Sequence, residues 1–277
     1  MNDYKMNAFT GIKQPIDQDA GIKRREITQR TSKGTVTRSD MVANEVPVAF
    51  IYNGNSHAVM MATPIDLNDF AVGFSMTERI IDNPSDIHSI EIRRAHHGMT
   101  IELDIAEHLI ERLSSKNRQF SGRTGCGVCG ISDLAAAIPN LDPIQKTALP
   151  EHHIIQKSMT LFAEQQVLQR QSGAVHAAAL FSQEGSFIAA REDIGRHNAL
   201  DKLIGGHIQS MTAQHFIVLS SRASHELVVK SVIAGIGSLV SISAATTLAI
   251  ELAKKTNLNL IGFIRNDRQV IYSNPNN

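Results

Sequence analysis

The sequence predicts an α/β protein with two subdomains, the second of which is a layered α/β/α sandwich around a mixed sheet. Two observations carry this prediction. After residue 150, apolar runs of strand length alternate with amphipathic runs of helix length, and such alternation is typical of a sheet covered by helices. The first half instead pairs its strand-like runs around turn residues, which indicates hairpins. With 42% apolar residues in a chain of 277, there is material for one large or two medium domains.

The first half contains two predicted hairpins with a helix between them. Asn53-Gly54 is a strong turn signal between the first two strand-like runs, and His96-His97 lies in the turn between the other two. Pro64 and Asp66 precede a segment whose apolar residues recur at helical spacing. A further helix, 106–119, is expected to lead into a cysteine loop. The four strand-like runs are 45–52, 56–63, 89–95 and 99–105.

The second half follows a proline-marked connection, and the boundary between the subdomains is placed near residue 145. We expect the helix 195–206 to end at its two glycines. The uncharged run 231–250 is long enough to span a bilayer. Because Gly235 and Gly237 interrupt it, we interpret it as a helix end, a buried strand and a helix start. The predicted helices are 155–171, 195–206, 223–235 and 244–256, and the predicted strands are 174–182, 186–193, 215–221, 238–243, 258–265 and 269–273.

Residues 1–44 are polar and show no periodicity, which predicts a flexible tail, so that order begins at Glu45. The expected division is this tail, a first α/β subdomain of residues 45–145 and a second of residues 146–277. The formal net charge is zero and there is no tryptophan, so neither a nucleic acid nor a membrane is expected as a partner. The N-terminal segment lacks the apolar core of a signal peptide. We therefore expect a cytoplasmic protein whose thiols stay reduced.

Cys126 and Cys129 are the only cysteines, and both lie in the glycine-rich stretch RTGCGVCG. A zinc site would need two further ligands, such as His176 or His197. A thioredoxin-like disulfide normally lies between a strand and a helix, whereas this pair follows a predicted helix. A third interpretation is a mobile nucleophile, because Arg123 can stabilise a thiolate and the glycines let the loop bend; two inert thiols are the fourth. The flexible loop favours sulfur carriage, and no dedicated metal is expected.

Polar residues follow several predicted strand ends of the second half. His197 and Asp201 lie four residues apart on one face of a helix that starts directly after a strand. Ser221 and Arg222 follow the next strand, and two arginines flank the turn in residues 263–268. Strand ends and free helix amides of α/β proteins bind anions, so we expect a phosphorylated ligand; solvated surface charges are the alternative. No GxGxxG or GxxxxGK[ST] motif is present, which disfavours a Rossmann cofactor and a P-loop.

Six segments occur in an order that resembles the FdhD/NarQ family, the formate dehydrogenase accessory sulfurtransferases. The similarity runs from Glu45 to Tyr272 and leaves out the polar tail. The C-terminal part of that family resembles the cytidine-deaminase fold without its zinc chemistry, so the second subdomain is expected to do the same. The six segments are GRTGCGVCG, HAAAL, EDIGRHNALDKLIG, SSRAS, SAATTLA and LIGF.

The resemblance implies a function in sulfur transfer. Members take sulfur from a cysteine desulfurase, hold it as a cysteine persulfide and pass it to the molybdenum cofactor, in its bis-molybdopterin guanine dinucleotide form, before the formate dehydrogenase apoenzyme receives it. The resemblance makes Cys126 the persulfide carrier and Cys129 its assistant, and it implies a homodimer. The family's cofactor-binding segment corresponds to Phe263, Ile264, Arg265, Asn266, Asp267 and Arg268.

One departure concerns that segment, because related sequences often have Pro-Gly where this chain has Asn266-Asp267. Two alternatives to a sulfurtransferase stay open. One is a non-enzymatic chaperone that binds the cofactor and has structural cysteines, and sulfur turnover at the loop distinguishes it. The other is a zinc-dependent hydrolase, which metal analysis of the purified protein would identify.

Overall fold

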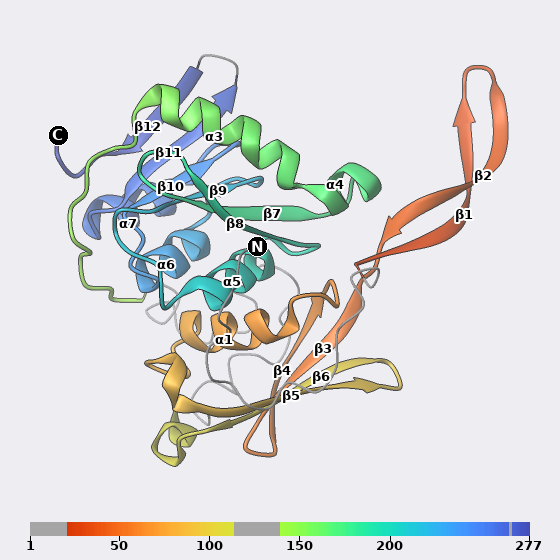
Figure 1. Ribbon diagram of the computed structural model, residues 1–277, viewed down its shortest axis with the longest axis horizontal. Coiled ribbons are helices and arrows are strands. Elements are labelled where there is room, and N and C mark those ends of the chain that lie inside the picture. Colours follow the sequence, from red (N-terminus) through yellow and green to blue (C-terminus); the bar gives the residue numbers. More distant parts are fainter. Residues whose placement is uncertain (1–20, 114–138, 266–267) are drawn as a thin grey trace, which may run out of the picture.

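The computed structural model describes residues 21–113, 139–265 and 268–277. Two main sheets lie on either side of a helical layer, and a separate two-stranded hairpin projects from the body (Figure 1). The predicted α/β class is confirmed, with a layered second half. The connection 139–151 between the halves has no regular structure, and its Leu141 packs into the core of the second half.

The first sheet and its helix account for the first half of the chain. Its elements are β3 (Val46–Tyr52), β4 (Asn55–Ala62), α1 (Leu67–Thr77), the short helix η2 (Pro84–Asp86), β5 (Ile87–Ala95), β6 (Gly98–Ile105) and the short helix η3 (Glu107–Leu109). The strand order is β4-β3-β6-β5, with β3 and β6 parallel and the two hairpin pairs antiparallel. Asn53 and Gly54 have φ angles of 46° and 75°, as a tight hairpin turn requires. Both predicted hairpins are confirmed. Of the predicted helix 106–119, residues 107–113 are helical, and residues 114–119 lie outside the described residues.

The second half is a six-stranded sheet between two helical layers. Its elements are α3 (His152–Gln165), α4 (Val167–Ser172), β7 (His176–Phe181), β8 (Phe187–Asp193), α5 (Arg196–His207), β9 (Phe216–Leu219), α6 (His225–Ile233), β10 (Ser238–Ser241), α7 (Thr247–Lys255), β11 (Asn259–Arg265) and β12 (Arg268–Ser273). The strand order is β12-β11-β10-β9-β7-β8. β9, β10 and β11 are parallel, whereas β12, β7 and β8 run antiparallel to their neighbours. One face packs on α3 and the other on α5, α6 and α7, which is the predicted α/β/α sandwich.

The uncharged run 231–250 is the end of α6, the buried strand β10 and the start of α7, as predicted. Every residue of β10 is buried, and a strand covered on both faces needs apolar or small residues throughout. None of the helices in the described part of the chain is long and apolar enough to cross a membrane.

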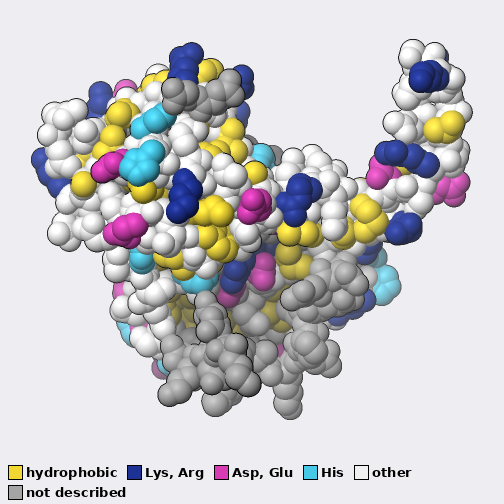
Figure 2. Space-filling view, turned by 45° about the horizontal axis from the view of Figure 1, so that its top comes forward, with side chains coloured by type: hydrophobic (Ala, Val, Ile, Leu, Met, Phe, Trp, Pro, Cys, Tyr) yellow, Lys and Arg dark blue, Asp and Glu magenta, His cyan; other side chains and the backbone are white. Residues whose placement is uncertain are grey.

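The expectation of an irregular tail up to residue 44 is wrong for residues 22–43. These form β1 (Ile22–Thr31) and β2 (Gly34–Ala43), an antiparallel hairpin that stands away from the body (Figure 2). Most of its side chains are exposed, so no alternation of apolar and polar residues marks the strands. The hairpin is favoured by backbone pairing and by its threonine and other β-branched residues, and burial contributes little. Hydrophobic periodicity therefore gave no signal for these strands.

The two halves meet where α1 packs closely on α5. A Cβ atom on Gly73 would lie 1.8 Å from the carbonyl oxygen of Asp201, and one on Gly205 would lie 1.9 Å from that of Asp69. The expectation that α5 ends at its glycines is therefore wrong, since the helix continues through them to His207. These glycines allow two helix backbones to approach, because they have no side chain at the contact.

Replacing Gly205 by Ala is expected to lower the free energy of unfolding by about 1–3 kcal/mol, because the new methyl group meets the backbone of α1. Gly206→Ala is the matched control. The nearest atoms to a Cβ at Gly206 belong to the side chains of Asp69 and Arg191, and Ala is the better helix former. Urea unfolding measures both variants, and equal stability of the two would contradict the close packing.

Candidate functional site

The carboxyl ends of the parallel strands β9, β10 and β11 meet at one edge of the second sheet. Leu219 of β9 pairs with Ser241 of β10 and with Ala178 of β7. Because β7 is antiparallel, it begins at this same edge with His176, which pairs with Asp193 at the end of β8. The helices α5, α6 and α7 start here too, since each follows one of these strands. Ligand sites of α/β sheets typically lie outside such an edge.

Phe263 and two arginines form a compact group at the turn between β11 and β12. The guanidinium carbons of Arg265 and Arg268 lie 5.2 and 4.9 Å from the centre of the Phe263 ring, which is cation–π distance. Phe263 has a left-handed φ of 55°, and its amide donates to the carbonyl oxygen of Ser243 at 2.9 Å. Residues held in this region often occur at ligand sites. Both arginines are exposed, so their charges are open to an anionic ligand.

The other predicted residues of segment 263–268 differ in whether a ligand can reach them. Ile264 is 5% exposed and packs in the core beneath α3, so its side chain does not face a ligand. Asn266 and Asp267 lie outside the described residues, as do Cys126 and Cys129. The roles of these four residues therefore stay predictions.

Ser221 and Arg222 follow β9, as predicted, and have different roles in the loop. The Ser221 hydroxyl donates to the carbonyl oxygen of Arg222 at 3.0 Å, and the Ser221 carbonyl accepts from the Ser241 hydroxyl. Ser221 is buried and Arg222 is exposed. Arg222 is thus the residue that can meet an anion, while Ser221 shapes the loop.

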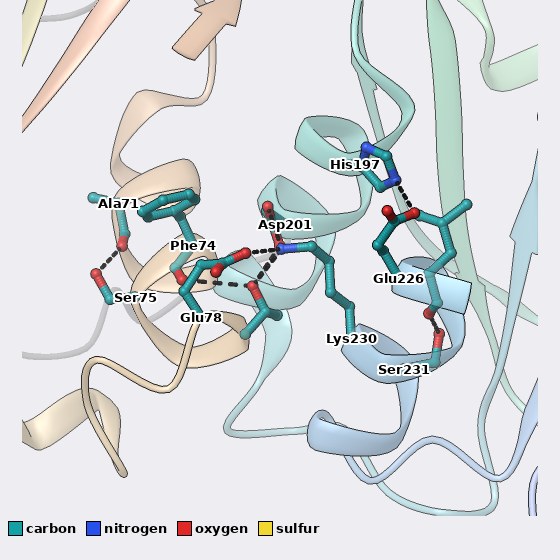
Figure 3. A network of polar contacts seen from close by, with 11 residues as sticks. Ala71, Phe74, Ser75, Glu78, His197, Asp201, Glu226, Lys230 and Ser231 are labelled. Atoms are coloured by element: carbon teal, nitrogen blue, oxygen red, sulfur yellow. Dashed lines mark hydrogen bonds and ion pairs between the residues drawn. The ribbon is translucent and has the colours of Figure 1, made fainter. Parts of the chain in front are cut away.

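His197 lies in the first turn of α5 and is paired with the first turn of α6 (Figure 3). Its Nε2 lies 3.2 Å from Oε2 of Glu226, and the Ser224 hydroxyl donates to the same oxygen at 3.0 Å. Burial opposes ionisation of Glu226, but the hydrogen bond and charge of His197 and the Ser224 hydroxyl bring the pKa of Glu226 below its ordinary value. Glu226 is therefore a carboxylate near neutral pH, and it fixes the imidazole ring.

Three further side chains lie beside this pair. His176 Nδ1 is 3.4 Å from the Ser220 hydroxyl. Burial, and then the charges of Arg196 and His197, lower the pKa of His176. The Nε atom of Arg196 is buried and has no hydrogen-bond partner among the described residues. We call the group of His176, Arg196, His197, Ser220 and Glu226 the α5–α6 corner.

Glu226 was not predicted from the sequence as a site residue. A signal existed, since Ser224 and Glu226 stand two residues apart at the start of a predicted helix. A serine followed by an acidic residue there normally indicates helix capping, and only the contact with α5 shows that the carboxylate holds a histidine.

A separate open cavity of about 660 Å³ lies between the halves and includes Arg79, Asp82 and Arg112 in its lining. It touches Val232 and Ile233 at the far end of α6, so it is not part of the sheet edge. Among the described residues, no group of three or more His, Cys, Asp or Glu side chains is placed to hold a metal ion. Neither cysteine is among those residues.

The fold and the sheet edge define an α/β protein with a candidate anion site at strand ends. The sequence model of the FdhD/NarQ family matches residues 43–277 of this chain. The chain belongs to the FdhD/NarQ family, as the resemblance of its six segments indicated.

Curated relatives agree with this assignment, and one solved structure shares the fold. The chain is 43% identical over 238 residues to "Sulfur carrier protein FdhD" of Cupriavidus necator, covering 85% of this chain and 83% of the relative. The protein of that name from Variovorax paradoxus is 44% identical over 238 residues, covering 85% and 86%. A crystal structure of a candidate formate dehydrogenase accessory protein from Desulfotalea psychrophila matches with a TM-score of 0.70 over 92% of this chain and 97% of that chain. At 22% identity, this match supports the fold alone.

Proposed function

We propose that this chain is a sulfur carrier that serves the maturation of a formate dehydrogenase. The observation that carries the proposal is its membership of the FdhD/NarQ family over residues 43–277, a range that contains both cysteines. The names of the relatives at 43% and 44% identity support it. Sulfur carriage needs a reactive thiolate, and Cys126 and Cys129 are the only thiols in the chain.

Cys126 accepts the sulfur in this proposal. Its thiolate attacks the outer sulfur of a persulfide on a cysteine desulfurase, the donor S–S bond breaks, and the donor cysteine leaves as a thiolate. The Cys129 thiolate then attacks the inner sulfur of the Cys126 persulfide and expels hydrosulfide toward the acceptor. This step leaves a Cys126–Cys129 disulfide, and a dithiol reductant returns the two electrons that restore both thiols.

The acceptor is the molybdenum cofactor in its bis-molybdopterin guanine dinucleotide form, which is the substrate of the protein. The sheet edge suits such a molecule, because Arg222, Arg265 and Arg268 are exposed cations and Arg side chains bind phosphate well. The ring of Phe263 offers an aromatic contact for a guanine base. The formate dehydrogenase apoenzyme is the final partner, and a cytoplasmic homodimer without a dedicated metal completes the proposal.

Incubation with a cysteine desulfurase and cysteine, followed by peptide mass spectrometry, tests the sulfur-carrier function. We expect one or more added sulfur atoms on the peptide that contains Cys126, and we expect a reducing thiol to remove them. A protein that binds the cofactor but never gains sulfur would instead be a non-enzymatic chaperone. One tightly bound zinc ion per chain would favour a hydrolase.

Arg268→Ala is expected to weaken binding of guanosine diphosphate by about 1–3 kcal/mol, because a charged hydrogen bond to the nucleotide is lost. Arg94→Ala is the matched control, since Arg94 is an exposed arginine on β5 of the other sheet. Isothermal calorimetry measures both variants beside the parent. Unchanged affinity in Arg268→Ala would remove this residue from the site.

A further inference from the structure

The hairpin of β1 and β2, which we call the arm, has one face that carries both apolar and basic side chains. Successive side chains of a strand point to opposite faces, so the strand pairing assigns each residue of the arm to one face. Val36 and Val42 are 56% and 40% exposed, and lysine and arginine side chains lie along the arm in Figure 2. This amphipathic face includes Ile27, Val36, Val42, Lys23, Arg25 and Arg38.

The arm is basic, although the whole chain is neutral. Residues 22–43 contain six basic and two acidic residues, a net charge of +4, whereas the formal net charge of the chain is zero. On the amphipathic face, Arg38 is paired with Asp40 at 3.0 Å, which leaves Lys23 and Arg25 to meet a partner. A two-stranded hairpin without a covering surface is only marginally stable in water. A surface with apolar and acidic side chains would therefore stabilise the arm.

The first sheet has a face of that complementary kind. Its inner face packs on α1, whereas none of the side chains on its outer face belongs to a hydrophobic core within the described residues. The outer face is apolar on β3 and β4, where Val59 and Met61 are 58% and 49% exposed. It is polar and largely acidic on β5 and β6. The side chains that concern us here are Ala49, Val59 and Met61 beside Glu91, Glu102 and Asp104.

The acidic half of this outer face keeps a negative charge. Residues 82–113 contain seven acidic and three basic residues, a net charge of −4, which is equal and opposite to that of the arm. Glu91 lies opposite Glu102 in the β5–β6 pair. The two carboxylates share Arg93, at 2.6 and 3.6 Å, and Asp104 accepts a hydrogen bond from the uncharged Ser89 hydroxyl at 2.7 Å. A basic partner is therefore favoured at this half of the face.

We infer that the arm of one copy packs its amphipathic face on the outer face of the first sheet of a second copy. The arm stands away from the body of its own chain (Figure 1), so a second copy supplies the complementary face. Val36 and Val42 meet the apolar half of that face, while Lys23 and Arg25 meet its acidic half. In a twofold dimer each copy gives one arm and receives one. The inference rests on the homodimer of the proposed function and assigns the surfaces that form it.

The size of the contact suits a stable dimer. Each strand of the arm has ten residues and spans about 33 Å, and two paired strands are about 10 Å wide. One face of the arm therefore covers about 330 Å² and buries a similar area on the partner's sheet. Two such contacts bury about 1,300 Å² in total, which lies within the range of specific protein interfaces.

Two charge-reversed variants and their mixture test the inference by sedimentation equilibrium in about 0.15 M salt. The arm variant combines Lys23→Glu with Arg25→Glu, and the sheet variant combines Glu91→Lys with Asp104→Lys. Each variant alone places like charges in both contacts, so the dissociation constant of its dimer is expected to rise about tenfold or more. An equimolar mixture is expected to dimerise more tightly than either variant. In the mixed dimer one contact is that of the parent, and the other joins the two reversed sets of charges.

Arg24→Glu combined with Arg30→Glu is the matched control. Both arginines are exposed on the opposite face of the same arm, so the control has the same change of charge as the arm variant. Its dissociation constant is expected to stay within about threefold of the parent value, because exposed charges away from the contact are screened by salt. Thermal melting shows whether each variant folds. If the sheet variant does not fold, Val59→Lys on the same outer face takes its place.

Three results would overturn the inference. They are a parent that stays monomeric at about 100 μM, an arm variant that dimerises as tightly as the control, and a mixture no tighter than its components. A monomeric parent whose binding to a cysteine desulfurase is lost in the arm variant alone would assign the arm to the sulfur donor instead. Sulfur loading of the same samples tests the proposed function separately. Loading without dimers contradicts the arm contact alone, and dimers that gain no sulfur contradict the sulfur carrier alone.

Discussion

Cys126→Ala is expected to abolish both sulfur loading from a cysteine desulfurase and activation of the client formate dehydrogenase. A persulfide forms only on a thiol, and Cys126 is the residue that we propose as the carrier. Arg123 and the surrounding glycines support this role, because a cation stabilises a thiolate and glycines let a partner approach. Mass spectrometry measures loading, and formate dehydrogenase activity in cells without the native chain measures delivery.

Cys129→Ala is the matched variant for that experiment. It keeps the accepting thiol but lacks the one that expels hydrosulfide, so persulfide should accumulate on Cys126 while activation of the client falls. The role assignment is wrong if Cys126→Ala still collects sulfur at Cys129 alone and still activates the client. Normal activation of the client by Cys129→Ala would show that only the role of Cys129 in releasing the sulfur is wrong.

Many helices and strands of the second half could be predicted, because the burial of each one is reflected in its pattern of apolar residues. Residues 216–219 and 238–241 are buried throughout, and continuous apolar or small runs of this length are typical of central parallel strands. Once the strands are placed, parallel strand ends must meet at one edge, so topology alone places Arg222 and the 263–268 turn at the same edge of the sheet. That they bind one ligand stays a prediction.

Other features could not be predicted, because they depend on contacts between distant segments. Gly205 lies next to Asp69 of another helix, so a glycine that resembled a helix end is a packing position. Ile264 lies among polar site residues in sequence, yet strand alternation turns it into the core. Glu226 belongs to the site only because α5 brings His197 against it. The hairpin 22–43 could not be predicted for the opposite reason, since most of its side chains are exposed.

The helices α5 and α6 are joined by two polar pairs one helical turn apart (Figure 3). His197 pairs with Glu226, and four residues further along each helix Asp201 pairs with Lys230. The sequence placed His197 and Asp201 on one face of a helix, and this face is the one that meets α6. Lys230 also reaches α1, where its Nζ donates to the Thr77 hydroxyl at 2.8 Å. This second pair therefore fixes α5, α6 and the first half of the chain together.

Lys230→Met is expected to lower the free energy of unfolding by about 3–5 kcal/mol, the cost of removing one partner from a buried ion pair. Lys230 Nζ lies 2.9 and 3.0 Å from the two carboxylate oxygens of Asp201, which is 2% exposed. Burial alone would lower the pKa of Lys230, but Asp201 and Glu78 outweigh it and hold that pKa above its ordinary value. Without the ammonium group, the Thr77 hydroxyl, at 2.7 Å, is the one hydrogen-bond partner that the buried carboxylate keeps among the described residues. Urea unfolding at neutral pH gives the loss, provided that the slope matches that of the parent.

Two further variants decide whether the charge or the packing of Lys230 matters. Lys230→Met combined with Asp201→Leu should recover a large part of the loss, because apolar residues of similar size can replace a buried ion pair. Arg112→Met breaks an ion pair with Asp82 whose side chains are 39% and 59% exposed, and it should cost about 1 kcal/mol or less. If Lys230→Met costs no more than Arg112→Met, the buried pair does not hold the two halves together. If the double variant is as unstable as Lys230→Met alone, removal of the unpaired Asp201 carboxylate has restored no stability. The loss of stability is then explained by the lost packing contacts of the Lys230 side chain.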